Sequence, residues 1–200
     1  IKEEFCYLFV GHWMQGNFGH DRKNVGFLIK SFYETFKNKK KKPALILKAS
    51  TGVAGYMSRD EILDRIKGIR NSVNSKILPN IYILNGEFED SEMNELYNHP
   101  KVKAMVSLTK GEGFGRPLLE FTTTGKPVIA SGWSGHTDFL NKEYSLLLPG
   151  ELEPVHQSAA NNWLIQEAKW FKPDDRYVGQ VLRDVFKKPK AFQSKKKKKK

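Results

Sequence analysis

The sequence has little cysteine and lacks a long apolar run. Its only cysteine, Cys6, has no partner within the chain for a disulfide, and it lies in the apolar run FCYLFV, which is typical of a small buried side chain. No apolar run approaches the roughly 18 to 20 residues that span a bilayer, and the N-terminus lacks the pattern of a signal peptide. We therefore expect a cytoplasmic protein.

Metal-site patterns are also missing from the sequence. No Asp-x-Asp pair occurs, and no group of His and Cys has the spacing of metal ligands. The nearest acidic cluster, Glu87 to Asp90, is interpreted as a loop that leads into a helix cap. We expect neither a metal nor a cofactor.

Arginine is scarce, and the positive charge is concentrated in two lysine runs. The net charge of +12 includes the six lysines of Lys195–Lys200 and the four of Lys39–Lys42. Lysine outnumbers arginine 27 to 7 and no aromatic residues are interleaved with these runs, so we expect no nucleic-acid partner. Peripheral contact with an anionic membrane is an alternative role for the basic surface, worth about 1 kcal/mol per well-placed lysine.

Short apolar runs alternate with amphipathic segments along most of the chain. This alternation predicts one α/β domain over residues 1–190, with a Rossmann-like, mostly parallel sheet flanked by helices, and a disordered lysine-rich tail over 191–200. The expected strands are 5–11, 43–50, 80–86, 102–108 and 126–131, and the expected helices are 24–36, 58–75, 90–99, 116–125 and 174–187. The helix at 90–99 is expected to be capped by Asp90 or Ser91.

The loops that follow the strands are where a ligand is expected. In parallel α/β sheets, ligands bind at the carboxyl ends of the strands. These loops come after Val10, Leu47, Leu84, Leu108 and Ala130.

One of these loops contains the stretch EGFGRPLLE, from Glu112 to Glu120. Gly113 and Gly115 let the backbone approach a ligand closely, and the helix that Pro117 opens favours an anion such as a diphosphate at its N-terminus. Glu120, one turn into that helix, could accept hydrogen bonds from two neighbouring hydroxyls, such as those of a ribose. Glycine-rich turns that open helices are common, however, and a purely structural role for both glutamates stays open.

Several motifs, taken in order, resemble the family 4 glycosyltransferases. These are retaining enzymes of the GT-B architecture, and the resemblance is to their C-terminal, nucleotide-sugar-binding domain. The matching stretches are the glutamate pair Glu112 and Glu120, separated by seven residues, together with YLFVG at 7–11, RKN at 22–24, GKPVIAS at 125–131 and WFKPDD at 170–175.

The resemblance implies transfer of a sugar from a nucleoside-diphosphate sugar, of UDP or GDP type, to a hydroxyl acceptor with retention of configuration. It assigns catalytic roles to Glu112, Lys23 and Arg22, the two cations contacting the diphosphate and Glu112 the sugar, and it assigns the ribose to Glu120. The other expected donor-binding residues are Gly11, His12, Lys48, Gly113, Phe114, Gly115, Arg116 and Leu118.

Two positions depart from the family pattern. His12 stands where many members carry an arginine that touches phosphate, and Asp138 stands where a glutamate is common. The chain begins at Ile1, directly at the first strand, so we expect the N-terminal acceptor domain to be missing and this fragment to transfer little sugar alone. Two alternatives remain, namely a nucleotide-sugar epimerase on the same scaffold and a basic module that binds nucleic acid or membrane.

Overall fold

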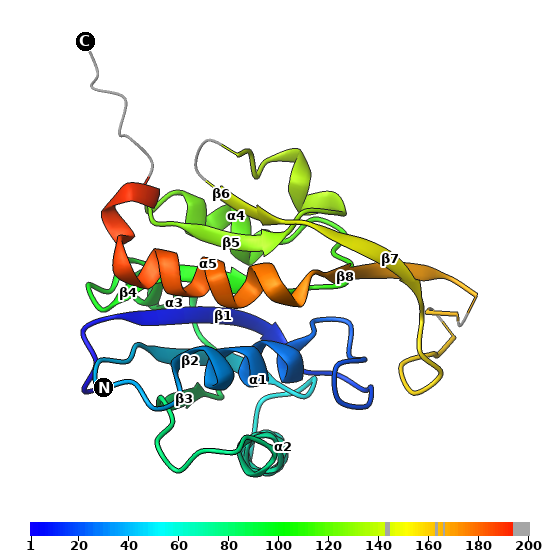
Figure 1. Ribbon diagram of the computed structural model, residues 1–200. Coiled ribbons are helices and arrows are strands. Elements are labelled where there is room, and N and C mark those ends of the chain that lie inside the picture. Colours follow the sequence, from blue (N-terminus) through cyan, green and yellow to red (C-terminus); the bar gives the residue numbers. More distant parts are fainter. Residues whose placement is uncertain (143–144, 163, 166, 194–200) are drawn as a thin grey trace.

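The fold is built on a parallel sheet of six strands in the order β3-β2-β1-β4-β5-β6 (Figure 1). The computed structural model describes residues 1–142, 145–162, 164–165 and 167–193. The strands are β1 (Cys6–His12), β2 (Ala44–Ser50), β3 (Ile81–Leu84), β4 (Val102–Ser107), β5 (Val128–Ser131) and β6 (Ser145–Leu148). Each pair of neighbours runs parallel, which confirms the Rossmann-like fold that the alternating pattern predicts.

Helices cover both faces of the sheet. One face carries α1 (Val25–Phe36), α2 (Tyr56–Ser72) and α5 (Asp175–Lys187), and the other carries α3 (Asp90–Asn98) and α4 (Arg116–Thr122), as Figure 1 shows. Two short 3-10 helices complete the set, η1 (Gly135–Asp138) and η2 (Pro189–Phe192).

The alternation of side chains along β1 explains how both faces are buried. Tyr7 and Phe9 point into the core beneath α1, α2 and α5, whereas Cys6 and Leu8 point into the core beneath α3 and α4. All four are fully buried, and side chains such as Leu8 and Phe9 each contribute about 1.5 to 3 kcal/mol through burial. Burial also raises the pKa of Cys6 to about 11, which agrees with the structural role expected for this thiol.

Some boundaries differ from those expected. The cap of α3 is Glu89, not Asp90 or Ser91, because Glu89 forms a capping box in which its backbone N–H donates to Glu92 at 2.8 Å. Helix α2 ends three residues before the expected position. The sequence pattern also did not predict the antiparallel ribbon of β7 (Gly150–Pro154) and β8 (Lys169–Pro173), which projects beyond the sheet in Figure 1.

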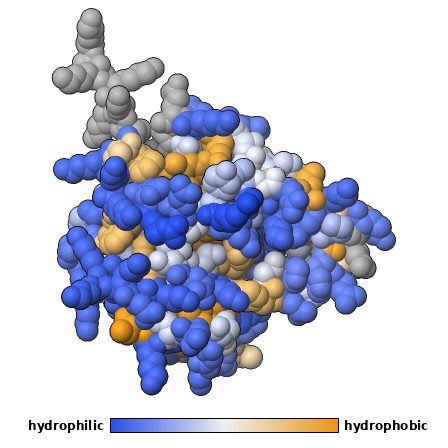
Figure 2. Space-filling model, in the orientation of Figure 1, coloured by the Kyte–Doolittle hydropathy of each residue, from blue (hydrophilic) through white to orange (hydrophobic). Residues whose placement is uncertain are grey.

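The face that α1 and α5 cover is mainly hydrophilic, with apolar side chains only in small patches (Figure 2). Among the helices that the structure describes, none has the length and apolarity required to cross a bilayer. Residues 194–200, most of the expected lysine-rich tail, lie outside the described residues.

Candidate functional site

The sheet order changes direction at β1. Its two neighbours are β2 and β4, so the chain leaving β1 passes to the α1 face while the chain leaving β4 passes to α4 on the opposite face. Loops that diverge in this way leave a crevice at the carboxyl edge of the sheet, the usual ligand position in such folds. The RKN motif, which follows β1, and the glycine-rich stretch, which follows β4, both lie at this edge.

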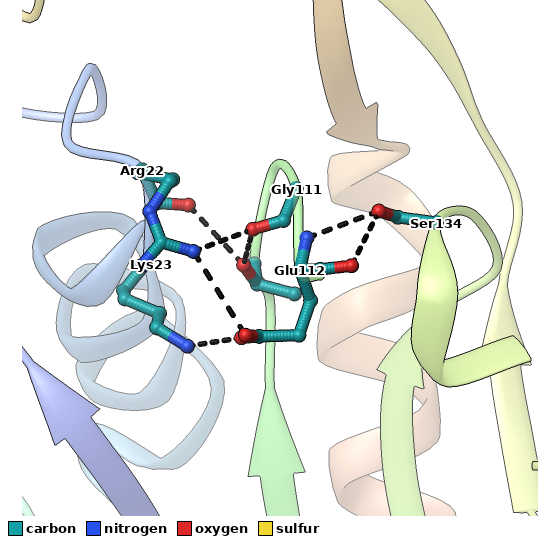
Figure 3. Close-up of polar contacts among 6 residues, drawn as sticks. Arg22, Lys23, Gly111, Glu112 and Ser134 are labelled. Atoms are coloured by element: carbon teal, nitrogen blue, oxygen red, sulfur yellow. Dashed lines mark hydrogen bonds and ion pairs between the residues drawn. The ribbon is translucent and has the colours of Figure 1, made fainter. Parts of the chain in front are cut away.

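A cluster of two cations and one carboxylate bridges the two loops (Figure 3). Lys23 Nζ donates to Glu112 Oε2, and Arg22 Nη1 lies 4.0 Å from Glu112 Oε1. Arg22 Nη1 also donates to the carbonyl oxygen of Gly111 at 2.8 Å. The sequence-predicted catalytic residues Lys23, Arg22 and Glu112 are therefore in contact, and the cluster carries one positive charge in excess.

Lys23 is more enclosed than Arg22. Its side chain is 13% exposed against 42% for Arg22. Burial lowers the pKa of Lys23, and the neighbouring Glu112 partly opposes this effect. A second anion entering beside Lys23 would therefore favour its charged form.

The backbone around Glu112 is held by the segment after β5. Ser134 Oγ accepts from the Glu112 N–H at 3.0 Å and donates to the Glu112 carbonyl oxygen at 2.8 Å, as Figure 3 shows. The Gly135 N–H donates to the same carbonyl at 3.0 Å. A side chain at Gly135 would place its Cβ 1.9 Å from the Gly113 carbonyl oxygen, so only glycine fits this approach. These contacts fix the glycine-rich loop from the side opposite Lys23.

Glu120 lies on α4, in a pocket of about 510 Å³ between α3 and α4. Its Oε1 is 2.9 Å from Arg116 Nε, and its Oε2 accepts from the hydroxyl of Tyr97 at 3.0 Å. The lining is Val10, Lys48, Phe88, Asp90, Met93, Asn94, Tyr97, Arg116, Pro117, Glu120 and Thr123. The pocket thus combines two carboxylates, Asp90 and Glu120, and two cations, Lys48 and Arg116, with apolar walls at the ligand edge of the sheet.

Comparison with known proteins identifies the family of the chain. A family model described as glycosyl transferases group 1 matches residues 8–166. The chain belongs to this family. No curated protein matches the sequence.

Solved structures share the fold of this glycosyl transferase domain at low sequence identity. The C-terminal domain of the group 1 family protein LpcC from Francisella tularensis has 14% identity and a TM-score of 0.60, covering 94% of this chain and 77% of that one. Anabaena HepE, solved in complex with UDP-glucose, has 12% identity and a TM-score of 0.56, covering 94% and 40%. A UDP-forming trehalose-phosphate synthase from Burkholderia vietnamiensis has 13% identity and a TM-score of 0.60, covering 94% and 37%.

The chain spans less than half the length of the last two proteins, and most of the C-terminal domain in the first. Its fold is therefore that of the C-terminal domain of a GT-B glycosyltransferase.

Lys48 contacts the loop after β3 in this glycosyl transferase domain. Its Nζ donates to the Gly86 carbonyl oxygen at 2.6 Å and lies 4.6 Å from the centre of the Phe88 ring. Burial lowers its pKa, and Glu87 acts in the opposite direction. Lys48 thus lines the Glu120 pocket.

The remaining sequence-predicted residues are divided between surface and core. His12 is exposed and its Nδ1 is 2.8 Å from Ser50 Oγ, while Gly11 lies beside the stem of Lys23. Gly113 and Phe114 are exposed at the rim of the loop.

Three further positions lie in or next to α4 and η1. Gly115 is buried with φ +86°, and Leu118 packs into the core beneath α4. Asp138 ends η1, the turn that follows the Ser134 and Gly135 contacts.

Sequence reasoning missed Ser134, Tyr97 and His136. His136 is fully buried, its Nε2 is 2.7 Å from the Ser131 carbonyl oxygen, and its Cβ would lie 3.1 Å from a Cβ added at Gly115. Burial lowers its pKa, although the Ser131 carbonyl acts to raise it. Ser134 and His136 lie in the same stretch as Asp138, one of the two positions compared with the family pattern, whereas no sequence signal indicates Tyr97.

Proposed function

We propose that this chain is the donor-binding domain of a retaining, family 4 glycosyltransferase that moves a hexose from a nucleoside-diphosphate sugar to a hydroxyl acceptor. One observation carries the proposal, namely that the Glu120 pocket and the Lys23–Arg22–Glu112 cluster both lie at the carboxyl edge of the sheet, where the sheet order reverses. A pocket with a carboxylate suits a nucleoside, and an adjacent excess of positive charge suits a diphosphate.

In this proposal each charged residue binds one part of the donor. Lys23 and Arg22 take the diphosphate, Glu120 takes the ribose hydroxyls, and Glu112 with the backbone near Phe114 and Gly115 takes the sugar. The base then lies toward Lys48 and Phe88, in the part of the pocket formed by the loop after β3.

Charge stabilisation is the main chemical task of these residues. Breaking the bond between the sugar and the phosphate builds negative charge on the leaving diphosphate. Lys23, held in place by Glu112 and largely shielded from solvent, would stabilise that charge more in the transition state than in the ground state. The cations thus supply the charge that a metal supplies in other transferases, and we propose a metal-independent reaction.

A nucleoside diphosphate of UDP or GDP type is the proposed donor group. Two of the structural neighbours support testing UDP first, because one is solved with UDP-glucose and another is described as UDP-forming. We further propose an N-terminal domain as the partner that holds the acceptor, since this chain covers only 40% and 37% of the two longer structural neighbours.

Calorimetric titration with UDP, GDP, ADP and their sugar conjugates tests the proposal. We expect one nucleoside diphosphate to be preferred, and Lys23→Ala and Glu120→Ala each to weaken it by about 1 to 3 kcal/mol through loss of charged hydrogen bonds. Lys37→Ala is the matched control, because Lys37 pairs with Glu34 on the surface of α1, away from the pocket. Binding that none of the site variants weakens would reject the donor site.

A further inference from the structure

Tyr97 links the two helices that form the pocket. It lies in the last turn of α3, is 4% exposed, and packs edge-on against Phe121 of α4 with ring centres 5.8 Å apart. Its hydroxyl crosses to α4 and donates to Glu120 Oε2 at 3.0 Å. Nothing in the motif pattern assigns it a role.

The backbone of Tyr97 is anchored as well as its ring. Lys126, just before β5, donates from Nζ to the carbonyl oxygens of Tyr97 at 2.7 Å and of His99 at 3.0 Å. These bonds satisfy carbonyl groups at the C-terminal end of α3, which have no partners within the helix. The Tyr97 hydroxyl is therefore presented to Glu120 from a fixed position.

The two carboxylate oxygens of Glu120 have partners that differ in solvent exposure. Oε2 is held by the buried Tyr97, whereas Oε1 is paired with Arg116, whose side chain is 75% exposed. An exposed pair such as this contributes little and exchanges readily. Burial raises the pKa of Tyr97 and Glu120 raises it further, so the phenol remains a proton donor throughout the neutral range.

We infer that Tyr97 is a positioning residue that fixes Glu120 through Oε2 and leaves Oε1 to accept the ribose hydroxyls of the donor when Arg116 moves away. This inference rests on the proposed function, in which Glu120 receives the ribose. A carboxylate held at one oxygen loses less rotational freedom on binding than a free one, which favours the bound state. Tyr97 thereby contributes to the preference for a ribonucleotide through Glu120.

The test compares a ribonucleoside diphosphate with its 2′,3′-dideoxy form in calorimetric titrations. UDP, GDP and ADP are titrated first, and the dideoxy analogue of the one that binds best is the second probe. We expect the unmodified chain to prefer the ribonucleotide by about tenfold or more, and Tyr97→Phe to reduce that preference by about three- to tenfold. Binding of the dideoxy form should change little.

Tyr82→Phe is the matched control. The Tyr82 hydroxyl also donates to a glutamate, Glu3 Oε2, at 3.0 Å, but Tyr82 and Glu3 are absent from the lining of the Glu120 pocket. This variant should keep the full ribonucleotide preference. Thermal melting checks that neither variant has lost stability. For Tyr97→Phe, an unchanged melting temperature would mean that the phenyl ring alone maintains the packing on Phe121.

A double-mutant cycle provides a second readout. If Tyr97 acts through Glu120, Tyr97→Phe should have no further effect on nucleotide affinity once Glu120→Ala is present. An equal loss of affinity for both probes, an unchanged preference in Tyr97→Phe, or additive effects in the double variant would each overturn the inference. Failure of the unmodified chain to bind any of the three diphosphates, or to distinguish ribose from dideoxyribose, would instead overturn the proposed function.

Discussion

Lys23 and Glu112, 89 residues apart in the sequence, form an ion pair that joins the loop after β1 to the loop after β4. Both side chains are largely shielded, at 13% and 15% exposure. The carboxylate thus lies at the cation that the proposal assigns to the donor diphosphate. Diphosphate and Glu112 would then compete for the charge of Lys23.

This competition predicts that Glu112→Gln tightens binding of a free nucleoside diphosphate. Removing the negative charge leaves Lys23 and Arg22 uncompensated, so the affinity for UDP or GDP should rise by about threefold or more. The affinity for the sugar conjugate should rise less, because the proposed contact of Glu112 with the sugar is weakened. Calorimetry on both ligands measures the two changes in one variant.

Glu34→Gln is the control for the expected gain in diphosphate affinity. Glu34 pairs with Lys37 on the surface of α1, so neutralising it alters the net charge equally without changing the cluster. An equal gain in both variants would mean that only the overall charge of the chain matters, and weaker binding in Glu112→Gln would contradict the proposed competition.

A second prediction concerns how alanine substitutions at Gly115 and Gly113 change the stability of the chain. Gly115 has φ +86°, and an added Cβ would lie 3.1 Å from His136 Cβ and 3.2 Å from Glu112 Cγ. We expect Gly115→Ala to lower the free energy of unfolding by about 1 to 2 kcal/mol from the backbone conformation alone. A Cβ at Gly113 would meet nothing within 4 Å, so Gly113→Ala should change stability far less. Urea denaturation of the two variants measures the difference.

The fold was largely predictable because buried parallel strands have a local signature. The CYLFV of β1 and the ALIL of β2 are continuous apolar runs, since both faces of each strand are covered there. The helices between them follow the spacing of apolar residues, and α1 begins and ends within one residue of its expected bounds. Propensity and tertiary structure agree in these segments.

The ribbon of β7 and β8 has no such signature. In GELEP of β7, four of the five residues are exposed, so no apolar run indicates a strand. The ribbon depends on pairing with KWFKP, fifteen residues after β7 ends, and that pairing is not visible in either segment alone. For α3, three adjacent acidic or hydroxyl residues could each act as the cap, and the capping box between Glu89 and Glu92 selects Glu89.

Site residues that belong to one sequence motif could be predicted from the sequence. Site residues that come from different elements and meet only in the folded chain could not. Glu112 and Glu120 lie in one stretch, so their shared location follows from the helix that Arg116 begins. Tyr97 and Ser134 come from other elements and contact these glutamates only because of how the sheet and helices pack. Local pattern contains no information about such pairs.

Because His136 is buried, we expect the free energy of unfolding to depend on pH. Burial lowers its pKa in the folded chain below the ordinary value near 6.5, so the unfolded chain binds more protons between the two values. The free energy of unfolding should therefore be highest above pH 6.5 and fall as the pH drops through this range. His136→Gln retains a donor for the Ser131 carbonyl but cannot titrate, and it should show a smaller decline between pH 7.5 and 5 in urea denaturation. Equal declines would contradict a role for His136.

The buried Lys110 is paired with Glu153, and the stability of the chain should depend on this partner. Lys110 follows β4, is 2% exposed, and its Nζ is 2.5 Å from Glu153 Oε1 in β7 and 5.1 Å from the centre of the Trp170 ring. Its backbone N–H donates to the Arg22 carbonyl oxygen at 2.8 Å, so the pair supports the loop that carries the donor-site cations.

Glu153→Ala should therefore be more damaging than removal of both charges. It leaves the Lys110 ammonium buried without a counter-ion, which costs about 3 kcal/mol or more, whereas Lys110→Met with Glu153→Leu replaces the pair by apolar groups of similar volume. Glu34→Ala, which breaks an exposed pair, should cost less than about 1 kcal/mol. Chemical denaturation ranks the three variants, and a double variant less stable than Glu153→Ala would show that the ion pair itself, rather than the cost of an unpaired charge, stabilises this loop.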